Sequence, residues 1–215
     1  MMKNYKIEIQ ELLSRIIEIE APSTEEAIDK SMEMYRAEEI YTSRKLESII
    51  PKALIQKEFF GECNPLGKWS ATVFYVSRKK CLLITNSITR YSVFIPGISK
   101  SDFKNLSEIF IDAFIEQLKR DGVTNKSIKI RSLIGEVTLH KTDNNRAIIG
   151  TQNYILENID VWKYEFGPFE NWDFKDINRR VNGIPYKQLG WLYPRERMRL
   201  LLEEIGIVES SLNQN

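Results

Sequence analysis

Hydrophobic and polar residues alternate with a period of two in two segments near the N-terminus, residues 4–10 and residues 15–20. Because successive side chains of a strand point to opposite faces, this pattern predicts two strands paired as an antiparallel hairpin with one polar face. Ser23 follows, three residues ahead of Glu26, and this spacing predicts a capping box at the start of a helix that runs to about residue 39. We expect this helix to cover the hairpin with Ala27, Ile28, Met32 and Tyr35.

Further apolar segments, separated by turn residues, predict a second antiparallel sheet and two longer helices in the rest of the chain. The predicted strands are residues 69–77, 80–86, 90–95 and 133–142, and the predicted helices are residues 102–120 and 146–162. Gly and Pro residues divide the remaining C-terminal third into shorter helices.

This order of elements predicts an α+β protein. It has a small ββα N-terminal unit followed by a larger antiparallel-sheet-plus-helices domain with a helical C-terminal region. The predicted boundaries are residues 1–42 for the first unit (the head), 43–68 for a connector, 69–206 for the larger domain (the body) and 207–215 for a polar tail. The hydrophobic content of 42% can supply a buried core, which argues against a disordered chain.

Charge is distributed unevenly, although the net charge is only +1. Residues 1–50 hold seven Lys and Arg against eleven Asp and Glu, whereas residues 51–100 hold eight against two. The head is therefore acidic and the start of the body is basic, so a surface that binds a polyanion is expected in the body.

Cysteine usage and hydropathy indicate the compartment. No segment approaches the roughly 20 apolar residues that span a bilayer, and the N-terminus lacks the apolar core of a signal peptide. Cys63 and Cys81 are not part of a C-x-x-C motif. We expect a cytoplasmic protein with two free thiols and no membrane partner, while a disulfide between the two cysteines stays open.

No pattern typical of a catalytic centre occurs. His140 is the single histidine, which excludes paired-imidazole chemistry and metal sites built on several histidines. Glycine-rich phosphate loops and the G-x-S-x-G elbow are absent. We therefore assign no catalytic residue, no metal site, no cofactor and no small-molecule substrate. Whether the protein is an enzyme stays open. The alternative is an RNA-cleaving nuclease whose metal is held by carboxylates such as Asp173, Asp176, Glu165 and Glu170.

Basic residues supply the candidate binding sites. A tight turn is expected to project Arg78, Lys79 and Lys80, and Tyr75 and Tyr91 beside it are expected to stack on bases. The other candidate nucleic-acid-binding residues are Arg90, Arg146, Arg179 and Arg180. In the alternative interpretation the turn is only a solvated hairpin tip. Likewise, Arg179, Arg180, Arg195, Arg197 and Arg199 are neutralised by neighbouring carboxylates.

The head resembles the DpnD/PcfM-like domain over residues 4–40. The segments KIEIQE and IEIEA and the helix start S-x-E-E-A occur in the order of that family. The family is carried by plasmid, phage and transposon genes and has no established activity. Some proteins with such a head are anti-CRISPR proteins that act on type II-A effector nucleases.

The body resembles a bacterial family of unknown function over roughly residues 66–162. The resemblance rests on WSATVFYVSRKKCLLITNSITRYSVFI, on the helix from Asp102 and on GEVTLHKTDNNRAIIGTQN. The last segment is similar to the family motif K-T-x-N-R-x-x-x-G-x-x-N, with one extra residue before Asn145. No catalytic residue is known for this family, so none is transferred.

These observations favour a mobile-element accessory protein that acts by binding. Its most concrete form is an anti-CRISPR inhibitor whose partner is a type II-A effector nuclease or its guide RNA. The alternatives are a nucleic-acid-binding protein of plasmid or phage maintenance and the metal-dependent nuclease described above.

Overall fold

The computed structural model describes residues 3–11, 13–36, 55–56, 64–123, 126–135, 137, 139–140 and 145–209. Most of the predicted connector, Cys63, Lys141, Thr142 and the end of the polar tail lie outside these residues.

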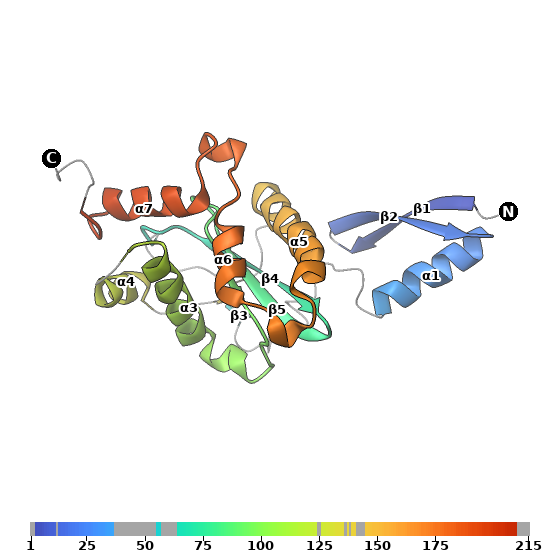
Figure 1. The fold of residues 1–215 in the computed structure, drawn as a ribbon, viewed down its shortest axis with the longest axis horizontal. Helices are drawn as coiled ribbons and strands as arrows, with labels where there is room; N and C mark the ends of the chain where they lie inside the picture. The colour runs from blue at the N-terminus through green and yellow to red at the C-terminus, as the bar shows by residue number, and fades with distance from the viewer. Residues whose placement is uncertain are drawn as a thin grey trace.

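The head consists of a hairpin and one helix (Figure 1). Strands β1 (Lys3–Glu11) and β2 (Leu13–Ala21) pair antiparallel, and α1 (Thr24–Arg36) follows. The Ser23 hydroxyl accepts a hydrogen bond from the backbone N–H of Glu26 at 3.2 Å. The hairpin, the helix and the role of Ser23 at the helix start are therefore confirmed.

The face with which α1 packs differs from the prediction. Ala27 and Ser31, four residues apart, are buried, whereas Ile28 and Met32 are 47% and 40% exposed. Residues four apart lie on one side of a helix, and the small side chains of Ala27 and Ser31 allow a close approach of the backbones. The expectation that Ile28 and Met32 cover the hairpin was wrong, because each lies one position beyond the packed side.

The body is built around a three-stranded antiparallel sheet in the order β4-β5-β6. Strand β4 (Trp69–Val76) pairs with β5 (Lys79–Asn86), and β5 pairs with β6 (Ser92–Ile95). This sheet confirms the first three strands predicted for the body. Two short strands, β3 (Ile55–Gln56) and β7 (Leu139–His140), pair in parallel elsewhere.

Helices make up most of the remaining body. They are η2 (Asp102–Asn105), α3 (Leu106–Arg120), α4 (Ser127–Ile134), α5 (Arg146–Phe166), η3 (Phe169–Asn171), α6 (Phe174–Val181), η4 (Lys187–Leu189) and α7 (Pro194–Glu204). The protein thus has the mixed α and β composition that the sequence predicts.

The strand predicted for residues 133–142 was wrong over its first part. Leu133 and Ile134 form the last turn of α4, which ends at Gly135 with a φ of 63°. With Ile130, these residues have the i, i+3, i+4 spacing of a helix face, and Ile130 is buried. Among the described residues of the predicted range, Leu139 and His140 alone form a strand.

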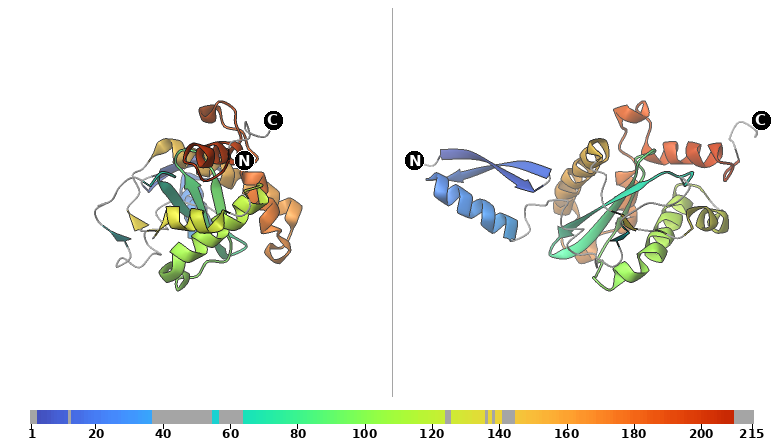
Figure 2. Two further views of the ribbon diagram at one scale, coloured as in Figure 1. Left: turned by 90° about the vertical axis from the view of Figure 1, so that its left-hand side faces the viewer. Right: turned by 180° about the vertical axis from the view of Figure 1, so that it is seen from behind.

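Helices cover both faces of the sheet. Alternate strand residues, among them Val73, Leu82 and Val93, pack against α3, α4 and α7. Their neighbours Phe74, Leu83 and Phe94 pack against α5, η3 and α6. The two views in Figure 2 show the strands between these helices. Because both faces are dry, the strands read as continuous apolar runs rather than alternating ones.

Side chains of α6 bind the free edge of β6. Asn182 accepts from the N–H of Ser92 and donates to its carbonyl, both at 2.8 Å. One turn earlier, Asn178 makes the same pair of bonds with Phe94, at 2.8 and 3.1 Å. A side-chain amide carries one donor side and one acceptor, as a peptide group does. The two asparagines therefore take the place of a fourth strand.

A polar network links Tyr91, which precedes β6, to the C-terminal end of α3. The buried Tyr91 hydroxyl donates to the Asp121 carboxylate, and Gln117 Nε2 donates to the same carboxylate at 3.3 Å. Burial raises the pKa of Asp121 above its ordinary value, and this outweighs the opposing effect of the hydrogen bonds from Tyr91 and Gln117. Gln117 Oε1 is buried without a partner among the described residues.

Replacing Asn182 by Ala should destabilise the body strongly. The change leaves the N–H and C=O of Ser92 buried and unpaired, and each such group costs about 1–3 kcal/mol, so we expect a loss of about 2–6 kcal/mol in unfolding free energy. Urea unfolding followed by circular dichroism measures it. The matched control is Asn153→Ala, at an exposed position of α5. Equal stability of the two variants would contradict the proposed role of Asn182.

Replacing Asp121 by Asn should stabilise the protein at neutral pH and have little effect near pH 3. The folded pKa of Asp121 is raised, so its favourable contribution is complete below the ordinary value of 3.8 and is lost as pH rises through the folded pKa. The new amide can also donate to Gln117 Oε1. Melting temperatures of both proteins between pH 3 and 8 provide the test, with the exposed Glu157→Gln as control. A constant difference across this range would sink the assignment.

Candidate nucleic-acid interface

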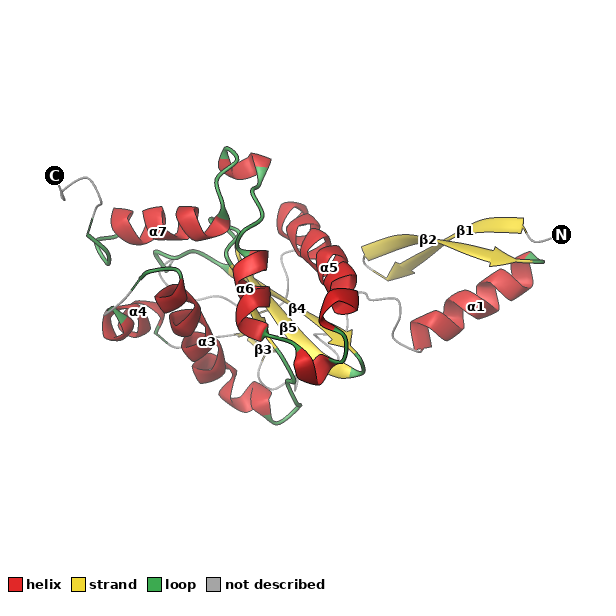
Figure 3. Cartoon of the chain, viewed as in Figure 1, coloured by secondary structure: helices red, strands yellow, loops and turns green. Residues whose placement is uncertain are grey.

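A hollow of about 500 Å³ lies where α5, α6 and the start of α7 meet. It is lined by Trp162, Arg179, Arg180, Gly183, Ile184, Tyr193 and Arg195, which we call the α6–α7 hollow. Figure 3 shows the connection between α6 and α7 extending away from the helices. The lining thus combines three guanidinium groups with two aromatic side chains.

The helix α6 presents Arg179 and Arg180 to this hollow because its other side is occupied. Ile177, Asn178 and Val181 are buried against the sheet. Asp173 begins the helix as its N-cap, with its carboxylate accepting from the backbone N–H groups of Lys175 and Asp176 at 2.9 and 3.3 Å.

Carboxylates pair with two of the three arginines. Asp176 is shared, at 2.5 Å from Arg179 and 2.7 Å from Arg180. Arg180 also binds both oxygens of Glu165, at 2.6 and 2.7 Å. The predicted alternative, in which neighbouring acids neutralise Arg179 and Arg180, is thus what the structure contains.

These ion pairs change the titration of both acids. Burial alone would raise the pKa of Asp176, but hydrogen bonds from Arg179 and Arg180 hold that pKa below its usual value. The hydrogen bond from Arg180 also lowers the pKa of Glu165. Both carboxylates are therefore ionised and engaged at neutral pH.

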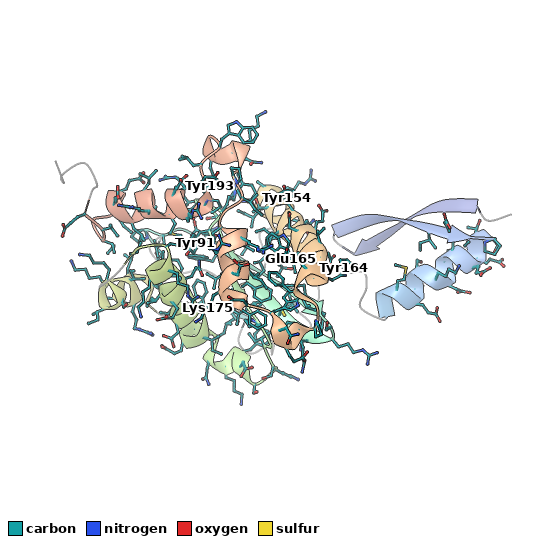
Figure 4. The ribbon with its side chains drawn as sticks, viewed as in Figure 1. Tyr91, Tyr154, Tyr164, Glu165, Lys175 and Tyr193 are labelled. Carbon is teal, nitrogen blue, oxygen red and sulfur yellow. The ribbon has the colours of Figure 1, made fainter. Side chains whose placement is uncertain are left out.

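Arg195 differs from the other two arginines. Its guanidinium lies over the ring of Tyr193, 5.1 Å from the centroid, and it has no ion pair within the described residues. Figure 4 labels Tyr193, which lines the hollow, and Glu165 of α5, which pairs with Arg180. The expectation that Arg195, Arg197 and Arg199 are neutralised together was wrong for Arg195. The other two pair with Glu204 and Glu203.

The predicted turn residues lie elsewhere on the body. Ser77 and Arg78 form the β4–β5 turn with φ values of 47° and 64°, and Arg78 and Lys79 are exposed. Arg90 follows the opposite end of β5, so roughly 23 Å of strand separates it from Lys79. The sheet therefore does not bring the turn and Arg90 together.

Two further expectations about individual residues have clear outcomes. Arg146 is the exposed first residue of α5 and does not line the α6–α7 hollow. Tyr91 is fully buried, so the prediction that it stacks on bases was wrong. Tyr75 is half-buried and packs against the core. Asn145 of the family motif accepts from the backbone N–H groups of Ala147 and Ile148, and thereby caps α5.

The hollow contains residues that the sequence analysis missed. Trp162 and Tyr193 were assigned no role, because nothing local distinguishes them from aromatic core residues. Arg180 lies 5.7 Å from the Trp162 ring centroid and 4.9 Å from that of Phe166. The one available signal was the short spacing of Tyr193 and Arg195 around Pro194, which begins α7.

A second hollow, of about 670 Å³, lies between α3 and α4. Arg131 crosses it and pairs with Glu108 and Asp112 of α3. Lys119 likewise pairs with Glu116 at 2.6 Å. The positive and negative side chains of this second hollow pair with one another, so it attracts an anionic ligand less than the α6–α7 hollow does.

Other chemical features are sparse in the described part of the chain. No group of three or more His, Cys, Asp or Glu residues that could hold a metal ion occurs there. Cys81 is buried, and burial raises the pKa of its thiol to about 12. Among the same residues no helix combines the length and apolar character required to cross a membrane.

Comparison with protein families identifies two segments. A family model described as a domain of unknown function (DUF6933) matches residues 39–197. The chain belongs to the DUF6933 family. A second model, described as DpnD/PcfM-like protein, matches residues 5–41. No curated protein and no solved structure matches the chain.

The family matches confirm both resemblances seen in the sequence. The DpnD/PcfM-like segment coincides with the head, and the DUF6933 match contains the quoted body segments. Together they suggest a mobile-element-associated protein of unknown function. The two matched segments meet at residues 39–41, while the exact domain boundaries stay a prediction.

Proposed function

We propose that this DUF6933 protein acts by binding single-stranded RNA, with the α6–α7 hollow as the main contact. The observation that carries the proposal is the lining of three arginines and two aromatic side chains in one shallow, open hollow. Proteins that bind unpaired bases combine cationic groups for phosphates with aromatic or guanidinium planes for base stacking.

Arg195 is the central cation of the proposed contact. Arg179 and Arg180 are committed to Asp176 and Glu165, whereas Arg195 has no ion pair among the described residues. Its guanidinium already stacks on Tyr193, which lowers the entropy cost of holding it in place. A phosphate can therefore bind Arg195 without breaking an ion pair, while the charge of Arg195 also acts on the Asp121 carboxylate.

A further exposed aromatic side chain lies on the connection that leads to α7. Trp191, on the connection between η4 and α7, is 66% exposed. Stacking of a base on a large exposed aromatic side chain is favourable, because it removes apolar surface from water. This position supports a path for unstacked bases along the α6–α7 connection.

The β4–β5 turn is proposed as an additional phosphate contact. Arg78, Lys79 and Lys80 have no ion pair among the described residues. Arg78 in the turn and Lys79 and Lys80 at the start of β5 raise the local concentration of a polyanion, and Tyr75 lies opposite Lys80 in the sheet.

Replacing Arg195 by Gln should weaken RNA binding at least roughly tenfold at low salt, because a charge-assisted contact is lost. The slope of log affinity against log salt should fall by about 0.7, as expected for one phosphate contact on a single strand. Fluorescence anisotropy with a labelled single-stranded RNA measures both. The matched control is Arg197→Gln on the same helix, which removes an arginine already paired with Glu204.

A triple replacement of Arg78, Lys79 and Lys80 by Glu forms a second arm of this titration. It should weaken binding strongly at low salt and little at high salt, with hardly any change in melting temperature. If Arg195→Gln binds RNA like the wild type at every salt concentration, the hollow is not the interface. If only the triple variant is impaired, the turn is the contact instead.

A more specific function is favoured by the head. Its resemblance to modules found in some type II-A anti-CRISPR proteins supports inhibition of a guide-RNA nuclease. Glu25, Glu26, Asp29 and Glu33 on α1 are exposed and give the head an acidic surface. Such a surface can occupy a positively charged nucleic-acid groove, while the body holds guide RNA.

Purified protein should then suppress target DNA cleavage by a type II-A nuclease at near-stoichiometric amounts. The order of addition, before or after guide loading, separates capture of free guide RNA from binding to the loaded nuclease. Indifference at large excess against several such nucleases contradicts this function but leaves RNA binding intact. Shortened guide RNA in the mixture would favour the nuclease alternative.

A further inference from the structure

Two buried hydrogen-bond donors lack a partner near the end of the sheet where β5 leads into β6. They are Nε of Arg90 and the hydroxyl of Tyr186, neither of which has a partner among the described residues. Tyr186 is only 8% exposed. Buried polar groups are almost always hydrogen-bonded, so two orphan donors in one region require an explanation.

The turn after β5 fixes the position of Arg90. Asn86 Oδ1 accepts from the backbone N–H groups of Ile88 and Thr89 at 3.0 and 2.9 Å, and the Arg90 N–H donates to the Asn86 carbonyl at 3.1 Å. Arg90 has a φ of 60°, and its Nη1 donates to the Ser87 carbonyl. The guanidinium is therefore held in place while its Nε–H stays unpaired.

Tyr186 reaches the same region from the α6–α7 connection. The bonds of Asn182 to Ser92 place the start of this connection beside β6, two residues from Arg90. On the other side the Tyr186 ring meets that of Tyr154 edge to face, with centroids 6.4 Å apart. Tyr154, labelled on α5 in Figure 4, is half exposed and lies toward solvent.

The charge of Arg90 interacts electrostatically with Tyr186. Burial raises the pKa of Tyr186, whereas the charge of Arg90 lowers it. Burial also lowers the pKa of Arg90, and within the described residues no carboxylate pairs with it. Arg90 therefore has no counter-charge among the described residues, and its Nε–H and the Tyr186 hydroxyl are both left without a hydrogen-bond partner there.

We propose that Arg90 and Tyr186 form a binding site for a phosphate group. A phosphate is anionic, carries only acceptor oxygens in this setting and can accept from a guanidinium and a hydroxyl that approach from different directions. The group belongs to a free phosphate compound or to a nucleic-acid backbone. Neither residue lines the α6–α7 hollow, so the proposal does not rest on RNA binding there.

The test uses the full chain and two probes, inorganic phosphate and a single-stranded RNA oligonucleotide, followed by NMR or calorimetric titration. We expect saturable binding of phosphate, of RNA or of both, weakened at least roughly tenfold in Arg90→Gln and Tyr186→Phe. Tyr186→Phe removes only an unpartnered hydroxyl, so its melting temperature should not fall. Arg197→Gln again serves as the matched control.

The two probes separate the two sources of phosphate. Weakened phosphate binding with unchanged RNA binding assigns the site to a free phosphate compound, and weakened RNA binding assigns it to the nucleic-acid backbone. If both variants bind both probes like the wild type, or if neither probe binds the wild type, water bridges the two donors and the proposal is wrong. Loss of RNA binding in Arg195→Gln alone leaves this outcome unaffected.

Discussion

The body depends on how the outer edge of β6 is satisfied. A three-stranded sheet has two edges, and the N–H and C=O groups along an edge cost free energy when they are buried without partners. Asn178 and Asn182 supply those partners for Phe94 and Ser92. The match is geometric, because four helical residues rise about 6 Å and two strand residues about 6.6 Å. One helix can thus replace a strand at two successive positions.

This docking determines what the opposite side of α6 can do. With Asn178 and Asn182 turned toward the sheet, the neighbouring Arg179 and Arg180 face away from it, and they meet Glu165 of α5 and Trp162 around one hollow. The connection after Asn182 carries Tyr186, on which the charge of Arg90 acts, before α7 begins. Both proposed sites therefore depend on the same pair of amide side chains, although they use different residues.

Unsatisfied groups are concentrated where the packing is otherwise complete. Within the described residues the buried atoms without partners are Arg90 Nε, Gln117 Oε1 and the Tyr186 hydroxyl. Gln117 belongs to the Tyr91–Asp121 network, where burial disfavours the charged form of the Asp121 carboxylate. The orphan oxygen of Gln117 is an acceptor beside an acid, whereas Arg90 Nε–H is a donor on a cation and the Tyr186 hydroxyl is able to donate. An anion would be repelled by Asp121 next to Gln117, whereas it would be attracted by Arg90.

The local order of the chain was determined by the sequence itself. Alternation and turn residues predicted the hairpin of the head and β4, β5 and β6. Ser23 and the long apolar stripe predicted α1 and α3, because these features act over one or two turns of chain. The same local rules failed at residues 133–134, where an i, i+3, i+4 spacing and an alternating one overlap. They failed again at Ile28 and Met32, because backbone approach through Ala27 and Ser31 decides which side of α1 is buried.

Tertiary structure alone decided the sites. Arg195 and Arg197 lie on different faces of α7, Tyr91 is buried in the core, and the charge of Arg90 acts on Tyr186, 96 residues later in the chain. Such pairings depend on long-range packing, which no pattern within a single segment records.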